Sequence, residues 1–217
     1  MTREPAPRNV CRRRVIPVLG AVCLFLAVVW LVWVLVDEPA ITGLRANHRT
    51  SWSIPLRHIL GQASTAMCFL GIISLVWTRS RAGALVTALL AVALAGALVV
   101  SVKGLVRRNR PDLASYQPRS APAGFLGAWS FPSGDASEAF AAATGLALFA
   151  SLRWRWALFI VAAAVAVNRV LVLQHWPSDV IAGAGLGIMC GYASLLIYRS
   201  WLEKPLAGLT QRFLKKH

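Results

Sequence analysis

Runs of apolar residues long enough to cross a lipid bilayer constrain this chain more than any other feature of its sequence. A membrane helix needs about 20 mostly apolar residues. The clearest run, residues 15–36, follows three arginines and is too long for a signal-peptide core, so we interpret it as a retained anchor. The expected fold is all-α, a bundle of six transmembrane helices. The other five runs cover 56–77, 82–102, 137–152, 156–173 and 180–201, and the run at 137–152, the shortest, is extended if it begins at Ser133.

The composition agrees with a membrane protein. Hydrophobic residues make up 57% of the chain and charged residues 14%, whereas a soluble domain carries about a quarter charged residues. The net charge of +15 is typical either of a nucleic-acid-binding protein or of membrane spans with basic flanks. The positions of the basic residues distinguish these two classes.

The basic residues are divided unequally between the two sides of the predicted bundle. With six spans, both termini and the loops after the second and fourth spans share one side, which holds 14 of the 23 Lys and Arg but two of the eight acidic residues. The positive-inside rule makes this side cytoplasmic. A nucleic-acid-binding surface concentrates its charge on one polar element, so we expect no nucleic-acid partner. The expected location is a bacterial-type cytoplasmic (inner) membrane.

We expect one membrane domain over residues 1–217. It has a basic cytoplasmic leader (1–14), spans one to three (15–102), a segment rich in chemical motifs (103–183) and a basic tail (202–217). The cysteine spacing predicts no disulfide framework and no metal site. Gly183, Gly187 and Gly191 recur every four residues, which favours close packing inside the bundle, with a dimer face as the alternative. The oligomeric state is left open.

Basic residues gather at the end of the third run. If the helix continues to Arg110, then Lys103, Arg107 and Arg110 share one face. Such a stripe suits a phosphate, which needs several donors. The alternative is a basic collar whose side chains extend to the membrane interface.

Two further segments contain polar residues beside apolar runs. Ser133-Gly134 before the fourth run combines a hydroxyl with the free N–H groups of a helix start, which suits an anion, although an ordinary helix cap fits equally. Arg169 lies within the fifth run, and His175 precedes Asp179 by four residues. A His held by a carboxylate keeps one ring nitrogen basic, as a nucleophile or a proton shuttle requires.

Together these segments resemble the motifs of the type 2 phosphatidic acid phosphatase (PAP2) superfamily of membrane lipid phosphatases. The family pattern is Lys, six residues, Arg-Pro; then Pro-Ser-Gly-His; then Ser-Arg, five residues, His, three residues, Asp. The matching segments are 103–111, 132–135 and 168–179, in the same order and with the same spacing. Each motif alone is weak, whereas the three together are specific.

The resemblance assigns a role to each matching residue. His175 is expected to attack phosphorus and form a phosphohistidine, and Asp179 to orient its ring. No metal or other cofactor is required on this reading, because positive side chains supply the charge neutralisation that phosphoryl transfer needs. The phosphate would be bound by Lys103, Arg110, Ser133, the amide of Gly134 and Arg169, with Arg107 as possible support.

Two positions depart from the family pattern. Asn168 stands where the family has Ser, and Asp135 where it has the His that protonates the leaving oxygen. An exposed Asp is deprotonated at neutral pH, but Glu138 lies one helical turn further on, and a neighbouring carboxylate disfavours a second negative charge. We hypothesise that Asp135 and Glu138 share a proton and act together as the general acid.

The resemblance implies a lipid phosphatase acting on a membrane lipid phosphate or diphosphate at the non-cytoplasmic side. A diphosphate leaves with less protonation than an alkoxide, so Asp135 favours undecaprenyl diphosphate or a lipid A type of substrate over phosphatidate. Two alternatives stay open. One is a phosphotransferase that passes the phosphate to a lipid or sugar hydroxyl. The other is a non-catalytic protein that binds or transports lipid phosphates.

Overall fold

The computed structural model describes residues 9–47, 82–111 and 129–202. All the regular elements within these ranges are helices. An isolated bridge between Asn109 and Trp129 joins two of the connecting segments. The helices are α1 (Asn9–Leu35), α2 (Asp37–Asn47), α4 (Ala82–Val106), α5 (Gly134–Ala147), α6 (Leu152–Leu171), α7 (Pro177–Ile197) and the π-helical turn η2 (Tyr198–Leu202).

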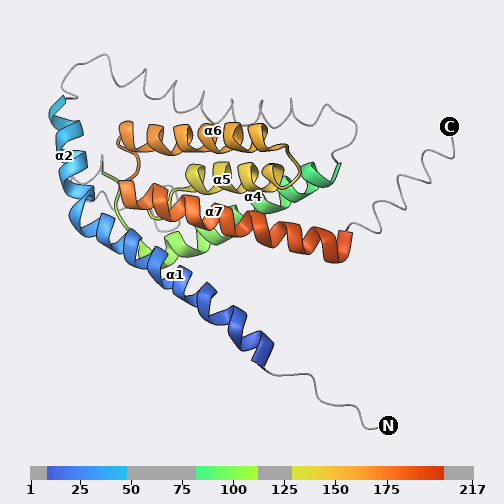
Figure 1. The fold of residues 1–217 in the computed structure, drawn as a ribbon. Coiled ribbons are helices and arrows are strands. Elements are labelled where there is room, and N and C mark those ends of the chain that lie inside the picture. Colours follow the sequence, from blue (N-terminus) through green and yellow to red (C-terminus); the bar gives the residue numbers. More distant parts are fainter. Residues whose placement is uncertain (1–8, 48–81, 112–128, 203–217) are drawn as a thin grey trace, which may run out of the picture.

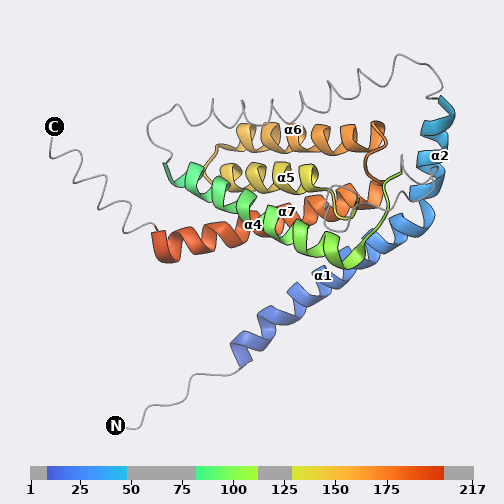
Figure 2. The same ribbon diagram turned by 180° about the vertical axis from the view of Figure 1, so that it is seen from behind.

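Helix α5 forms the centre of the bundle. It packs against α4, α6 and α7, while α1 crosses the bundle obliquely and continues through a bend into α2 at one end (Figures 1 and 2). The α5 surface is made of small residues, so its neighbours approach closely. Ala141 joins Ala91 and Ala95 of α4 in one buried cluster, and Ala139 and Ala143 join residues of α6 in another.

The glycines of α7 lie where this helix crosses α5. A Cβ added to Gly183 would stand 2.7 Å from the carbonyl oxygen of Ser133, and one added to Gly187 or Gly191 would also overlap α5. Backbone atoms at this distance cannot move aside as a flexible side chain can. The small-residue stripe therefore serves packing inside the bundle, which confirms the first of its two interpretations.

The described residues contain three helices long and apolar enough to span a membrane, or four if the α1–α2 pair, bent by 44°, counts as one. The chain is accordingly a multi-pass membrane protein. The predicted span at 56–77 lies outside the described residues. The shortest predicted run, 137–152, corresponds to α5, which has 14 residues and is not among the helices long enough to span a membrane. Its predicted earlier start is confirmed, since Ser133 caps α5.

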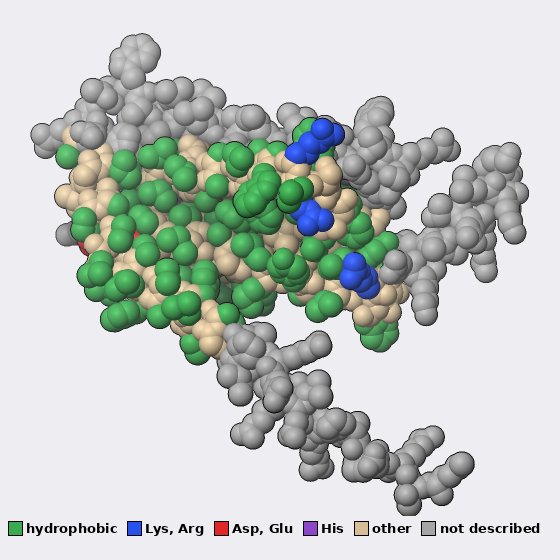
Figure 3. Space-filling view, viewed as in Figure 1, with side chains coloured by type: hydrophobic (Ala, Val, Ile, Leu, Met, Phe, Trp, Pro, Cys, Tyr) green, Lys and Arg blue, Asp and Glu red, His purple; other side chains and the backbone are tan. Residues whose placement is uncertain are grey.

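The outer surface matches a lipid environment. Large apolar side chains such as Trp30, Leu89 and Ile160 are exposed, and Figure 3 shows a flank dominated by hydrophobic side chains. The Lys and Arg visible in Figure 3 gather at the end of the bundle where α6 begins and α7 finishes. Arg153, Arg155 and Arg199 belong to this end, the one predicted to be cytoplasmic.

Candidate active site

Four helix termini meet at the opposite end of the bundle. Here α4 and α6 end while α5 and α7 begin (Figure 1). Each of the three motifs lies at one of these termini, so the alternating direction of the helices brings together segments far apart in sequence. Lys103 is buried in the last turn of α4 and interacts electrostatically with Arg110, Asp135, Glu138 and Asp179.

The basic segment after α4 is not a continuous helix. The helix ends at Val106, and Arg107 adopts a positive φ of 49°, an uncommon conformation for a residue other than glycine. The expected shared face of Lys103, Arg107 and Arg110 was therefore wrong. Arg107 is exposed and its Nε donates to the carbonyl oxygen of Gly104, 2.9 Å away.

The turn at Arg107 is followed by a segment held in an extended path. The backbone N–H of Ser130 donates to the carbonyl oxygen of Arg108 (2.8 Å), and its hydroxyl donates to that of Asn109 (3.0 Å). The indole N–H of Trp176 also donates to the Asn109 carbonyl (2.9 Å). These bonds hold the segment that carries Arg108 and Arg110 against the start of α7.

Ser133 has the position of a helix cap and is completely buried. Its hydroxyl accepts from the backbone N–H of Ala136 (3.4 Å), and its own N–H donates to the carbonyl oxygen of Asp179 (3.1 Å). Ser133 and Gly134 thus begin α5 directly beside the start of α7. The cap interpretation and the anion-binding interpretation describe the same geometry, because the amides of a helix start point out of its first turn.

Arg169 connects the end of α6 to the start of α5. Its guanidinium donates to the side-chain oxygen of Gln174 (2.9 Å) and forms an ion pair with Asp135 (3.1 Å). Asp135 is one-third exposed at its side chain, whereas that of Arg169 is largely buried. Asp135 therefore lies within reach of a residue predicted to bind phosphate, and Glu138 follows it one turn along α5.

His175 lies in the short loop between α6 and α7. Its backbone N–H donates to the carbonyl oxygen of Arg169 (3.2 Å), and its Nδ1 stands 3.6 Å from Oδ2 of Asp179. This distance exceeds a normal hydrogen bond, and Nδ1 has no hydrogen-bond partner among the described residues. Both side chains are fully buried, so the predicted His–Asp pair is present at ion-pair distance.

The environment of His175 favours its neutral form. Burial lowers the pKa of His175 below its ordinary value of 6.5, and the charges of Arg110 and Lys103 act in the same direction, while the carboxylate of Asp179 opposes them. A neutral imidazole is the form that can act as a nucleophile.

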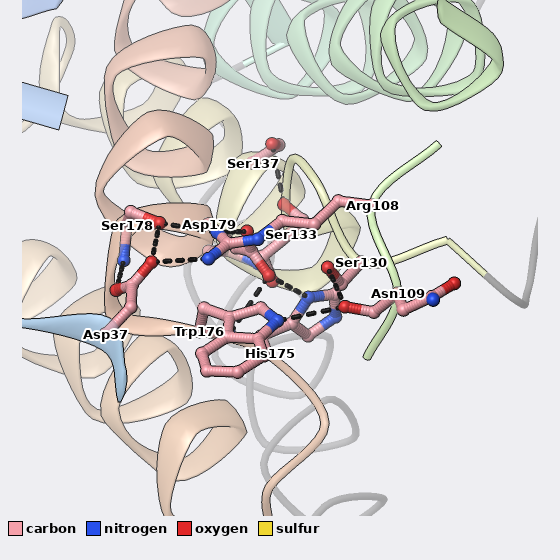
Figure 4. Close-up of polar contacts among 11 residues, drawn as sticks. Asp37, Arg108, Asn109, Ser130, Ser133, Ser137, His175, Trp176, Ser178 and Asp179 are labelled. Carbon is pink, nitrogen blue, oxygen red and sulfur yellow. Dashed lines mark hydrogen bonds and ion pairs between the residues drawn. The ribbon is translucent and has the colours of Figure 1, made fainter. Parts of the chain in front are cut away.

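Sequence reasoning missed a buried network around Asp179. Arg108 donates to Oδ1 of Asp179 and to Oδ2 of Asp37, both at 2.7 Å (Figure 4). It also donates to the hydroxyl of Ser178 (2.7 Å), whose backbone N–H donates to Asp37 (2.9 Å). One signal was present in the sequence: Asp37 is an acidic residue at the end of an apolar run, and ionisable residues at membrane depth are usually functional.

The described residues contain no group of three or more His, Cys, Asp or Glu arranged to hold a metal ion. The charged side chains at this end of the bundle are mixed. They include the basic residues Lys103, Arg110 and Arg169 and the acidic residues Asp37, Asp135, Glu138 and Asp179. Fold and site together define an α-helical membrane protein with a cluster of charged side chains around a His–Asp pair at one end of the bundle.

The chain belongs to the PAP2 superfamily. The family model matches residues 84–203, which include all three motifs and more than half of the chain. Two solved structures share the fold. LpxE of Aquifex aeolicus is 28% identical with a TM-score of 0.55, covering 73% of this chain and 94% of LpxE. A PAP2-type phosphatidylglycerolphosphate phosphatase of Bacillus subtilis is 19% identical with a TM-score of 0.61, covering 84% and 96%.

Curated relatives match over shorter stretches. A lipid A 1-phosphatase of Porphyromonas gingivalis is 34% identical over 129 residues, 56% of this chain and 26% of that protein. An undecaprenyl-diphosphatase of Sulfolobus acidocaldarius is 43% identical over 70 residues, 32% of this chain and 34% of that protein. The chain therefore spans about a third or less of the length of these two relatives.

Proposed function

We propose that this protein is a lipid phosphatase that hydrolyses a membrane lipid phosphate or diphosphate through a phosphohistidine. The observation that carries the proposal is the 3.6 Å approach of His175 to Asp179 at the end of the bundle where Lys103, Arg110 and Arg169 also lie. Phosphoryl transfer depends mainly on positioning and charge neutralisation. A buried neutral imidazole among positive side chains provides both.

The proposed reaction has two steps. In the first, a ring nitrogen of His175 forms a bond to phosphorus while the bond from phosphorus to the leaving oxygen breaks, and that oxygen takes a proton from the Asp135–Glu138 pair. In the second, water attacks phosphorus, the P–N bond breaks, and the proton of the water returns to the carboxylate pair. Inorganic phosphate is released and His175 is restored. Lys103, Arg110, Arg169, Ser133 and the Gly134 amide would bind the phosphate oxygens.

The ion pair between Arg169 and Asp135 is compatible with this acid role once phosphate binds. A phosphate that takes over Arg169 brings negative charge next to Asp135. Like charges at close range disfavour the ionised form of a neighbouring acid. In the proposed mechanism the Asp135–Glu138 pair then supplies the proton that the leaving oxygen needs.

For the substrate we favour undecaprenyl diphosphate or a lipid A type of molecule over phosphatidate. The leaving-group argument from Asp135 supports this preference, as do relatives described as a lipid A 1-phosphatase and an undecaprenyl-diphosphatase. We place the reaction on the non-cytoplasmic side of an inner membrane. The support is the separation between the site and the basic end of the bundle that carries Arg153, Arg155 and Arg199.

The test is release of inorganic phosphate by the purified full-length protein in detergent micelles. Initial rates are compared on undecaprenyl diphosphate, lipid A and phosphatidate, with H175A as the blank and a chelator added in a parallel series. We expect the first two substrates to be faster than phosphatidate and the chelator to have no effect. A clear phosphatidate preference would contradict the substrate proposal, and equal release by H175A would contradict the mechanism. Transfer of label to an added lipid or sugar hydroxyl would identify the phosphotransferase instead.

The dependence of kcat/KM on pH is a further prediction. Only neutral His175 attacks phosphorus, so activity is lost as pH falls through the pKa of this residue. Because burial lowers that pKa, the acidic limb should have its half-maximal point below pH 6.5. A profile of kcat/KM on a substrate with a good leaving group measures the limb for the free enzyme. A half-maximal point above pH 6.5 would contradict the prediction.

A further inference from the structure

Arg108 lies at the centre of a buried network. It falls within the first motif segment, 103–111, at a position where the family pattern specifies no residue type. Its two terminal nitrogens contact different carboxylates: Nη1 contacts Asp179 at 2.7 Å and Nη2 contacts Asp37 at 2.7 Å. The Arg108 side chain is 11% exposed, and those of Asp37 and Asp179 are 1% and 0% exposed. Arg108 thus joins the bend between α1 and α2 to the carboxylate that faces His175, as Figure 4 shows.

Aromatic rings hold the guanidinium plane. The Arg108 guanidinium carbon lies 3.9 Å from the centroid of the Trp33 ring and 4.8 Å from that of Trp176. Stacking of this kind adds attraction to the hydrogen bonds. Both terminal nitrogens of Arg108 are bonded, and the rings of Trp33 and Trp176 lie against its guanidinium. The guanidinium therefore has little freedom to rotate.

Asp37 anchors the other arm of the network. One of its carboxylate oxygens accepts from the backbone N–H of Ser178, and the other accepts from the Ser178 hydroxyl and from Arg108. A buried carboxylate with these donors is strongly oriented, and removing one partner of a buried ion pair leaves the other uncompensated. Asp37 therefore restrains both Arg108 and the first turn of α7, which carries Asp179.

The two oxygens of Asp179 have separate partners. Oδ1 accepts from Arg108, whereas Oδ2 accepts from the backbone N–H of Trp176 (3.0 Å) and faces Nδ1 of His175. Bonds at both oxygens determine the plane of the carboxylate. Without Arg108 the plane can turn about the remaining bond, and the 3.6 Å approach to His175 is no longer held.

We propose that Arg108 and Asp37 are positioning residues of the phosphoryl-transfer step: Asp37 fixes Arg108, Arg108 fixes the carboxylate of Asp179, and Asp179 aligns the ring of His175. This inference rests on the proposed function. Partners beyond the primary ligands commonly orient a functional His, and their loss typically costs 10- to 100-fold in activity at metal centres. Here the His is a proposed nucleophile and not a metal ligand, but the contacts that orient it are of the same kind.

The test compares R108M, R108K and D37N with the wild type on the best lipid substrate. Neither Arg108 nor Asp37 is proposed to bind the phosphate. We therefore expect kcat to fall while KM stays within about twofold of the wild-type value. We expect R108M to lose about 10- to 100-fold in kcat, R108K to retain an intermediate rate because it keeps one charged donor, and D37N to lose less than R108M. In the double variant R108M/D37N the losses should be less than additive, since both changes act through the same carboxylate.

R153M is the matched control. Arg153 is also stacked on a tryptophan, with its guanidinium carbon 6.0 Å from the Trp154 centroid. It is exposed at the first turn of α6, a 20-residue helix about 30 Å long, and so lies far from His175. Its kcat should match the wild type. Adding methylguanidinium to R108A provides a second readout, because a small cation that fills the space between the two tryptophans should restore part of kcat.

Each outcome has a distinct meaning. If the wild type releases no more phosphate than H175A, the proposed function is wrong. If the wild type is active and R108M and D37N keep its kcat, or if KM rises while kcat is unchanged, the positioning role is wrong. If R108M fails to fold in detergent, R108K and D37N decide the question by the same comparison of kcat with KM. A loss of kcat in folded R108A that methylguanidinium does not reverse would also contradict the proposal.

Discussion

Replacing His175 with alanine should reduce phosphate release by about 10⁴-fold or more, the scale seen when the nucleophile of a covalent enzyme is removed. The reason is that no other described side chain offers a neutral nitrogen beside the Asp179 carboxylate, with Lys103 and Arg110 close by. The measurement is rapid mixing with substrate labelled in its phosphate, followed by an alkaline quench that preserves phosphohistidine. Wild-type protein should carry label during turnover, and H175A should carry none.

D179N is the companion variant. It keeps the size of the side chain but removes the charge, so label should still appear on His175, at a rate lowered by about 10²- to 10³-fold, as for loss of one preorganised electrostatic contact. Label on H175A at the wild-type level would show that another residue is the nucleophile. Equal rates for D179N and the wild type would remove the orienting role of Asp179.

Changing Asp135 to asparagine should lower turnover by about 10²-fold or more on substrates with an alkoxide leaving group, the usual contribution of a general acid. The loss should be smaller on a diphosphate, which leaves with less protonation. D135H should retain more activity than D135N, because imidazole can donate a proton and an amide cannot. Initial rates on a lipid monophosphate and a lipid diphosphate measure the contrast.

E138Q is the matched variant for the carboxylate pair. It lies one turn along the same helix and should also lose activity if the two residues share a proton. D135N also removes the ion pair with Arg169, so a change confined to KM would indicate a role in phosphate binding instead. Turnover unchanged in both D135N and D135H would rule out the general acid role.

Much of the fold could be predicted from the linear sequence because lipid imposes a simple rule. Every backbone polar group in the bilayer must be bonded internally, so long apolar runs become helices. The helices α1, α4, α6 and α7 overlap the runs at 15–36, 82–102, 156–173 and 180–201. The short α5 departs from the rule: it is surrounded by α4, α6 and α7, and a helix enclosed by protein need not match the bilayer thickness.

The site was predictable to the extent that spacing along a helix determines it. His175 and Asp179 are four residues apart around the start of α7, so their approach follows from local geometry. The Arg107 prediction depended instead on α4 continuing past Val106. A turn with positive φ ends the helix there and directs Arg108, not Arg107, toward Asp179. Hydropathy carries no information about that turn.

The sequence alone determined the membrane class, the family and the residue types of the proposed phosphate site, because these follow from apolar length and from spacing within short segments. Only the tertiary structure revealed Asp37 and Arg108 as partners, since they are 71 positions apart along the chain. Their contact exists because the end of α1, the end of α4 and the start of α7 meet at one end of the bundle. Because both residues are buried there, each charge needs the other as its partner. No pattern within a short stretch of sequence indicates such a pairing.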